Sequence, residues 1–193
     1  MRKFLKFMLI GSFFATVEEF LTVVIIRQDI ASYLFTLLIL FPAFLTFVWV
    51  TSPILGKLVA REPLKEITIF FAYGLIGLLI EWFLIGLSPW SDPNANWVLM
   101  LVFQLGMFSF WATVAFAPRI FIDTREASQN TRRAILKFYI PYFLIVYLIS
   151  LLVPEQLKFV MTIVLIILGY LMLNLFYIKY FLRLSEWKVN SGT

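Results

Sequence analysis

The segment Lys6–Ile26, KFMLIGSFFATVEEFLTVVII, is apolar for long enough to cross a membrane, yet it carries two adjacent glutamates near its centre. A helix of about 20 residues spans the hydrocarbon core of a bilayer. Carboxylates are costly in such a helix, and those that occur there tend to face a partner or a wet cavity and to mark a function. The segment therefore predicts a membrane-spanning helix and directs attention to Glu18 and Glu19.

Five further apolar runs of similar length follow this first one. The chain has 193 residues, of which 62% are hydrophobic and 14% are charged, so a water-soluble domain could not hide its apolar surface. The runs are continuous and rich in Leu, Ile and Phe, without the alternation of an outer-membrane barrel. We expect a single all-α integral membrane domain over 1–193, a polytopic bundle of six transmembrane helices. The expected spans lie near 6–26, 31–55, 67–88, 97–117, 134–153 and 158–182.

The basic residues predict how this bundle is oriented. If the spans alternate in direction, every one of the 16 Lys and Arg residues except Arg27 and Lys158 falls on one side of the membrane. Because cytoplasmic loops collect positive charge, we expect both termini in the cytoplasm, and we place the protein in a bacterial or archaeal cytoplasmic membrane. Topology and contact with membrane lipids then account for the net charge of +5, and no nucleic acid partner is expected.

The amino-acid composition also limits the chemistry. The chain contains no Cys and no His, which removes disulfides, thiolate metal sites and the commonest metal and haem ligand. It has no Walker motif, dinucleotide fingerprint or metal-ligand spacing, so we expect no metal and no cofactor. Carboxylates, tyrosines and lysines remain as the groups for proton transfer.

A third carboxylate, Glu81, is predicted at the same depth as Glu19. Each lies seven residues, or about 10 Å, before the predicted outer end of its helix. Gln104 lies seven residues into the next helix, which runs inward, and Tyr147 reaches a similar depth on the fifth helix. Polar side chains from several helices therefore fall at one level in the outer half of the bilayer.

Helical spacing predicts which face of the first helix points into the bundle. Gly11, Ala15, Glu18 and Thr22 form one stripe of small and polar residues, and the stripe that contains Glu19 lies beside it. Small residues allow helices to approach closely, so we expect both stripes to face other helices. The two glutamates are about 100° apart around the helix and are not expected to point straight into one pocket. Glu19 is preferred for the site, although the sequence leaves this choice open.

An internal repeat supports that preference. Sliding the chain by 62 residues aligns Glu19 with Glu81, Phe20 with Trp82, and Trp49 with Trp111. The alignment predicts a tandem pair of helical hairpins, formed by spans 1 and 2 and by spans 3 and 4. Parallel repeats in transporters are related by an axis along the membrane normal, which would set the two glutamates opposite each other.

These observations define a candidate site and three hypotheses. The residues predicted to bind substrate or protons are Glu19, Glu81, Glu18, Gln104, Trp82, Trp111 and Tyr147. Burial and like charge both penalise ionisation, so at least one of Glu19 and Glu81 is expected to hold a proton at neutral pH.

The first hypothesis is proton-linked binding or transport of a small cationic or lipophilic molecule. The second is a membrane enzyme that isomerises or cyclises an isoprenoid or other lipid, with Glu81 or Glu19 as the catalytic acid. The third is a structural subunit of a membrane complex, in which the glutamates form interhelical hydrogen bonds. The sequence leaves open whether the chain is an enzyme and whether it forms a homo-oligomer.

Overall fold

The computed structural model describes residues 1–59, 62–86 and 96–190, the last four without their side chains. Within these ranges the ordered elements are helices, and six helical segments are long and apolar enough to cross a membrane, as predicted. These segments are Arg2–Ile26, Ile30–Leu58, Leu64–Ile85, Trp97–Ile122, Glu126–Leu152 and Glu155–Glu186. Residues 87 and 88 of the predicted span 67–88 lie outside the described residues.

Three of the six segments contain a π-helical stretch. In chain order the elements are α1 (Arg2–Glu19), η1 (Phe20–Ile26), α2 (Ile30–Phe35), η2 (Thr36–Leu40), α3 (Phe41–Leu58), α4 (Leu64–Ile80), η3 (Glu81–Ile85), α5 (Trp97–Ile122), α6 (Glu126–Leu152) and α7 (Glu155–Asn190). Each π stretch widens the backbone to i→i+5 hydrogen bonds, such as the bond from the Arg27 N–H to the Thr22 carbonyl at 3.2 Å. Such stretches are rare and are frequent at functional sites.

Proline chemistry accounts for the position of η2. Pro42 stands at the start of α3 and has no N–H to donate to the carbonyl one turn earlier. The preceding N–H, that of Phe41, bonds instead to the carbonyl of Thr36, five residues back. η3 ends differently, at Gly86, whose φ of 82° is a left-handed conformation that glycine adopts readily.

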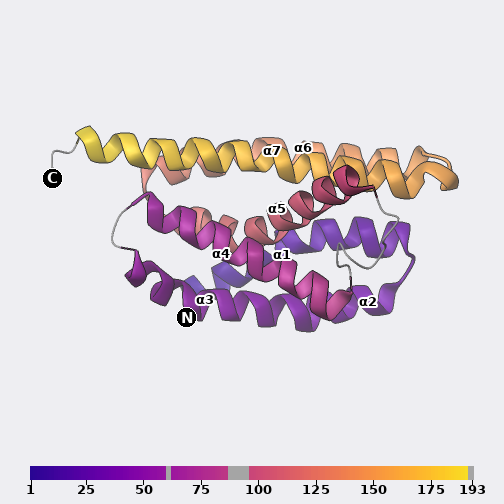
Figure 1. The fold of residues 1–193 in the computed structure, drawn as a ribbon, viewed down its shortest axis with the longest axis horizontal. Coiled ribbons are helices and arrows are strands. Elements are labelled where there is room, and N and C mark those ends of the chain that lie inside the picture. The colour runs from indigo at the N-terminus through magenta and orange to yellow at the C-terminus, as the bar shows by residue number, and fades with distance from the viewer. Residues whose placement is uncertain (60–61, 87–95, 191–193) are drawn as a thin grey trace.

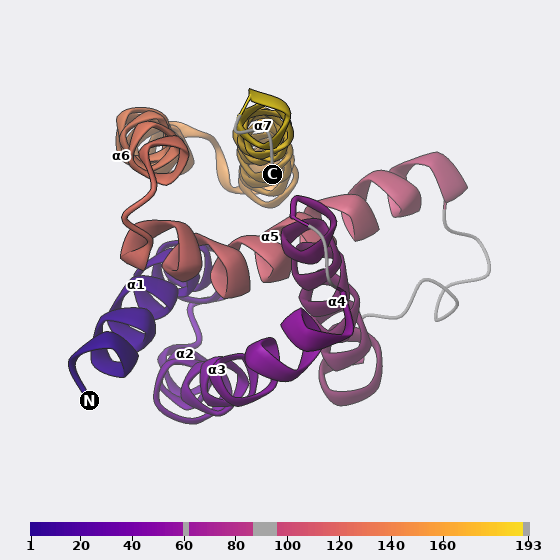
Figure 2. The ribbon, with the colours of Figure 1, turned by 90° about the vertical axis from the view of Figure 1, so that its left-hand side faces the viewer.

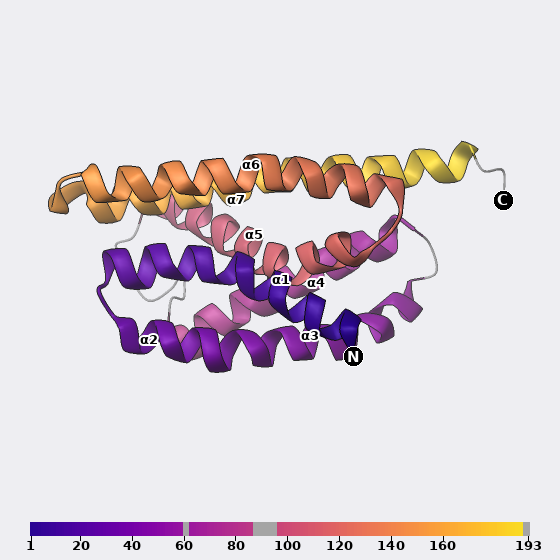
Figure 3. The ribbon, with the colours of Figure 1, turned by 180° about the vertical axis from the view of Figure 1, so that it is seen from behind.

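The other five spans pack around the steeply inclined helix α5. α6 and α7 lie side by side along one flank of α5, while α1, α3 and α4 occupy the other (Figure 1, Figure 2). Both termini lie toward the same end of the long axis, where α7 projects past the other helices (Figure 3). We call this the terminal end. The opposite end, where Ile26, Ile30, Ile85, Trp97 and Glu155 lie, is called the distal end.

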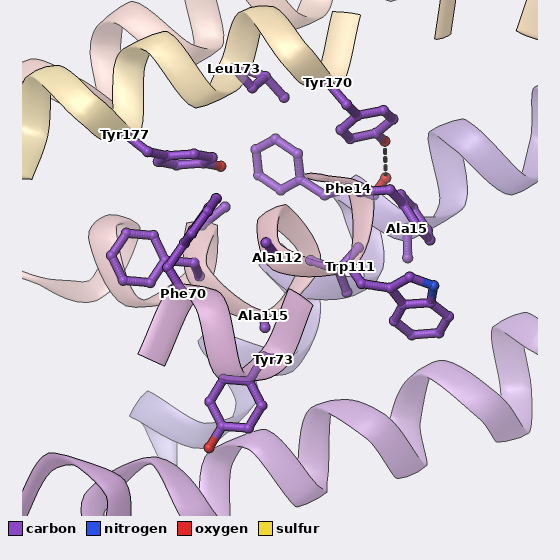
Figure 4. Close-up of a cluster of buried hydrophobic side chains, with 14 of the residues drawn as sticks. Phe14, Ala15, Phe70, Tyr73, Trp111, Ala112, Ala115, Tyr170, Leu173 and Tyr177 are labelled. Atoms are coloured by element: carbon purple, nitrogen blue, oxygen red, sulfur yellow. Dashed lines mark hydrogen bonds between the residues drawn. The ribbon is translucent and has the colours of Figure 1, made fainter. Parts of the chain in front are cut away.

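A layer of fully buried aromatic side chains fills the middle of the bundle (Figure 4). Phe14, Trp111 and Tyr170 are at most 1% exposed and come from three different helices. Ala112 and Ala115 of α5 are small enough to let these rings approach the helix backbone. The Tyr170 hydroxyl donates to the carbonyl oxygen of Phe14 at 3.2 Å, so the polar group of this ring is satisfied inside the membrane.

The predicted small and polar stripe of α1 faces the bundle. Gly11, Ala15, Glu18 and Thr22 are all buried. The cytoplasmic location of the termini and the tandem repeat of hairpins stay predictions.

Candidate functional site

A cavity of about 490 Å³ lies at the distal end and contains the three glutamates. Its wall is formed by the end of α1, η1, the following turn, α2, η2, η3, α5 and α7. The lining residues are Glu18, Glu19, Thr22, Val23, Arg27, Ser32, Phe35, Thr36, Leu40, Glu81, Leu84, Ile85, Phe103, Met107, Phe159 and Ile163. All three π-helical stretches contribute to this wall, so the departures from regular helix coincide with the cavity.

Glu18 and Glu19 both line the cavity, which differs from the expectation that only one of them would. Their side chains are 7% and 9% exposed, and that of Glu81 is 5% exposed. The cavity extends around the distal part of the first span, from Thr36 of η2 on one side to Ile163 of α7 on the other. Two neighbouring faces of the same helix therefore border one space.

Glu81 is held in place by Trp111. The indole Nε1–H donates to Glu81 Oε1 at 2.9 Å, across the α4–α5 interface. Gly77, one turn before Glu81, makes this contact possible, because a Cβ at that position would lie 2.0 Å from Trp111 Cγ. Trp111 does not line the cavity itself. It orients the carboxylate from behind the wall.

Arg27, which was not among the predicted site residues, faces the carboxylates from the rim of the cavity. Among the described residues it is the only basic residue in the lining, and it interacts electrostatically with Glu18, Glu19 and Glu81. Its side chain is exposed and forms no ion pair within the described residues. Its position could have identified it, since Arg27 is one of only two basic residues predicted on the outer side of the membrane.

Asp29 lies beside this rim, at the turn between the first two spans. Its Oδ1 accepts a hydrogen bond from the Ser32 backbone N–H at 3.0 Å and caps α2. The hydrogen bond from the Ser32 hydroxyl, with that from the backbone, lowers the pKa of Asp29 below its usual value. A fixed negative charge therefore stands near Arg27 at the cavity entrance.

Besides Trp111, three further predicted site residues lie outside the cavity wall: Trp82, Gln104 and Tyr147. The Trp82 Nε1–H donates to Gln104 Oε1 at 2.7 Å, and this pair joins η3 to α5. Tyr147 packs against Phe20, with ring centroids 6.2 Å apart. The aromatic residues in the lining are Phe35, Phe103 and Phe159 instead. Their rings offer apolar area and negative π faces but no hydroxyl or indole hydrogen-bond donor.

The two tryptophans that the repeat aligns have different surroundings. Trp111 is 1% exposed and bonds to the glutamate of its own hairpin. Trp49 is only partly buried and packs against Phe4 and Phe7, with ring centroids 5.6 and 5.3 Å apart. The glutamates nevertheless occupy matching places, since Glu19 immediately precedes η1 and Glu81 begins η3.

Hydroxyl groups complete the polar part of the site. The Thr22 hydroxyl donates to the backbone carbonyl of Glu18 at 3.1 Å. On the other side of the cavity, Thr36 faces Glu19. Beneath Glu18, the hydroxyls of Tyr139 and Tyr170 both donate to the Phe14 carbonyl and lie 3.3 Å from each other. Carboxylates and nearby hydroxyls are groups that can hold and exchange protons.

Comparison of the chain with protein-family models, with curated proteins and with solved structures gives no match. The geometry of the site is therefore the basis for any functional assignment. The six apolar helices are those of a multi-pass membrane protein, and among the described residues the distal cavity combines three carboxylates, one arginine and a largely apolar wall.

Proposed function

We propose that the distal cavity binds a small lipophilic cation in exchange for protons, and that the protein is a proton-linked binding or transport protein. The observation that carries this proposal is the presence of Glu18, Glu19 and Glu81 in one cavity with a single arginine at its rim. Three negative charges in so small a space repel one another, so carboxylates that share protons are favoured there. A bound cation would replace those protons and balance the same charge.

The walls of the cavity suit an organic cation better than a metal ion. A volume of about 490 Å³ lies within the range of small-molecule pockets. Phe35, Phe103 and Phe159 can contact a cation through their ring faces. Phe35 and Phe159 are also 56% and 54% exposed, so the apolar wall continues onto the outer surface of the helices. A lipophilic ligand could reach such a site from the membrane.

The transport part of the proposal draws on the layer beneath the carboxylates. The rings of Phe14, Tyr170 and Trp111 fill the bundle between the cavity and the terminal end. Passage across the membrane would require this layer to rearrange. The π-helical stretches in the cavity wall support the proposal, because such departures from regular helix are frequent at functional sites.

A binding titration with tetraphenylphosphonium would test this function, using the purified protein in detergent between pH 5.5 and 8.5. We expect affinity for this cation to rise with pH, since fewer protons then compete. Tetraphenylborate, an anion of the same shape, should not show this pH dependence.

Variants would link the binding to the carboxylates. Glu19→Gln and Glu81→Gln should each weaken cation binding about tenfold or more and flatten its pH dependence. Glu155→Gln removes a 74% exposed carboxylate at the same end and serves as the matched control. Unchanged binding in both cavity variants would reject the carboxylate mechanism. Cation binding without flux in liposomes would restrict the function to binding.

A second candidate is a membrane enzyme that protonates a lipid double bond. It is favoured by the hydrogen bond from Trp111, which fixes Glu81 Oε1 and leaves Oε2 as the atom that could carry a proton toward an apolar substrate. The phenylalanine rings would stabilise the resulting carbocation. Lipid extracts from expressing cells should then contain an isomerised or cyclised product that disappears with Glu81→Gln and persists with Glu155→Gln. The absence of any such product would reject the enzyme hypothesis and favour the binding function.

A further inference from the structure

A second and larger cavity, of about 720 Å³, lies at the terminal end and is lined by basic side chains. Its charged lining residues are Lys3, Lys57, Lys65, Arg119 and Arg125 together with Glu66 and Asp123. They come from α1, α3, α4, α5 and the turn between α5 and α6. The cavity therefore has a positive lining, in contrast to the distal cavity.

The arginines in this cavity are engaged with carboxylates of the protein. The Arg119 guanidinium donates through Nε to Glu66 Oε2 at 3.2 Å and through Nη2 to Glu66 Oε1 at 3.1 Å. Arg125 bonds to Asp123 and lies 3.6 Å from Glu66. These pairs join the start of α4 to the end of α5. The positive charges of Arg119 and Arg125 are therefore balanced by carboxylates of the protein.

The lysines of this cavity form fewer ion pairs than its arginines. Lys3 and Lys57 have no ion-pair partner within residues 1–59, 62–86 and 96–190. Lys65 has one partner, Glu62, at 3.6 Å, and both side chains are partly buried. Lys65 crosses α3 at Gly56, where an added Cβ would lie 2.7 Å from Lys65 Cε. Three lysines from three helices thus line the same cavity as the paired arginines.

We propose that this cavity binds a phosphate group. Lysine ammonium groups bind phosphate as point charges, and their convergence offers several donors to one anion. The apolar part of the lining, Phe7, Trp49, Pro53 and Ile122, would contact the remainder of the ligand. The cavity lies where the spans end, at the depth of lipid headgroups. The ligand is therefore a phosphate-bearing molecule, either an anionic phospholipid or a soluble phosphate compound.

The test compares two variants that each lose three positive charges. Lys3→Gln/Lys57→Gln/Lys65→Gln empties the cavity of lysines, while Lys137→Gln/Lys179→Gln/Arg183→Gln removes charges that do not line it. Native mass spectrometry of the full-length protein would measure binding of phosphatidylglycerol against phosphatidylcholine. A parallel titration would use inorganic pyrophosphate. Melting temperature and elution volume would establish that each variant folds.

The cavity variant should lose about tenfold or more in affinity for the phosphate ligand, and the control variant should change by less than about threefold. Lys3→Arg/Lys57→Arg/Lys65→Arg should retain binding, and raised salt should weaken it. Lysine-dependent binding of phosphatidylglycerol alone identifies a lipid headgroup, whereas lysine-dependent binding of pyrophosphate identifies a soluble ligand. Equal losses in the two triple glutamine variants, or binding of neither probe by the folded wild-type protein, would overturn the proposal. If the cavity variant does not fold, Lys57→Gln alone must weaken binding.

Discussion

At the terminal end the buried carboxylate of Glu66 accepts bidentate hydrogen bonds from Arg119, whereas at the distal end three buried carboxylates share a cavity with one exposed arginine. A buried charge with a well-placed partner is satisfied within the protein. Carboxylates that crowd together destabilise the folded state. The ion pair of Glu66 and Arg119 therefore joins α4 to α5, whereas the proposed function assigns the carboxylates of the distal cavity to a ligand.

The largest expected effect comes from breaking the terminal ion pair. Glu66→Ala should lower the free energy of unfolding by about 3 to 5 kcal/mol, because it leaves Arg119 without its buried partner. Thermal unfolding in detergent would measure this change. Glu126→Ala, an exposed change in the same region, is the control. The double variant Glu66→Met/Arg119→Met should recover much of the loss, and no recovery would argue against the ion pair as the cause.

A smaller effect is expected where α4 meets α5 beside the distal cavity. Gly77→Ala would place a methyl group against Trp111 and should destabilise the fold by about 1 to 3 kcal/mol through overpacking. It should also weaken ligand binding by displacing the Trp111–Glu81 hydrogen bond. Leu75→Ala removes an exposed side chain from the same helix and is the control. If a destabilised Gly77→Ala protein bound the ligand as tightly as the wild type, the Trp111–Glu81 hydrogen bond would not be needed for binding.

The six spans could be predicted from the sequence, because they depend on hydrophobic length. The convergence of Glu19 and Glu81 on one cavity also agrees with their matching positions along their helices. Sequence reasoning did not predict that Glu18 and Glu19 would share the cavity, since that depends on how η2 and α7 surround the first span. It also did not predict that Trp82, Gln104, Trp111 and Tyr147 lie outside the cavity wall and contact other residues. The position of a residue along a helix follows from the sequence, whereas the direction in which its side chain points depends on how neighbouring helices pack.

The ion-pair network of the terminal end predicts a specific response to acid. Burial alone would raise the pKa of Asp123, but hydrogen bonds from Ser128 and Arg125 outweigh burial and lower this pKa below its usual value. The stabilisation is therefore fully present above the unfolded pKa of about 3.9 and is lost as pH falls through the lower folded value.

Comparison of unfolding midpoints between pH 2.5 and 7 would test this prediction. Asp123→Asn should be less stable than the wild type at neutral pH, by about 1 kcal/mol, and the difference should shrink in strong acid. Glu126→Gln should follow the wild type across this range. A constant difference between Asp123→Asn and the wild type would show that the charge of Asp123 is not responsible.

The smallest expected effect concerns Arg27 at the rim of the distal cavity. Because this side chain is exposed, Arg27→Gln should leave the unfolding temperature nearly unchanged. Removing its positive charge should strengthen binding of tetraphenylphosphonium about two- to fivefold at low salt. Lys158→Gln, another basic residue at the distal end, should have less effect. Weaker binding by Arg27→Gln would contradict the assignment of a cationic ligand.

The terminal network was beyond sequence reasoning for a different reason. The basic run from Arg119 to Arg133 predicted topology, and membrane orientation alone could explain its charge. Its contact with Glu66 joins residues 53 positions apart and depends on the packing of α4 against α5. The distribution of basic residues therefore predicts the orientation of the protein in the membrane. Which charges form ion pairs can be known only from the folded structure.

The most direct test of the central claim is the number of protons released when tetraphenylphosphonium binds to the purified protein in weakly buffered solution. Near neutral pH the wild type should release protons on binding, whereas Glu18→Gln/Glu19→Gln/Glu81→Gln should remain folded and show neither binding nor release. Binding by the wild type without proton release, or equal release by the triple variant, would contradict the claim.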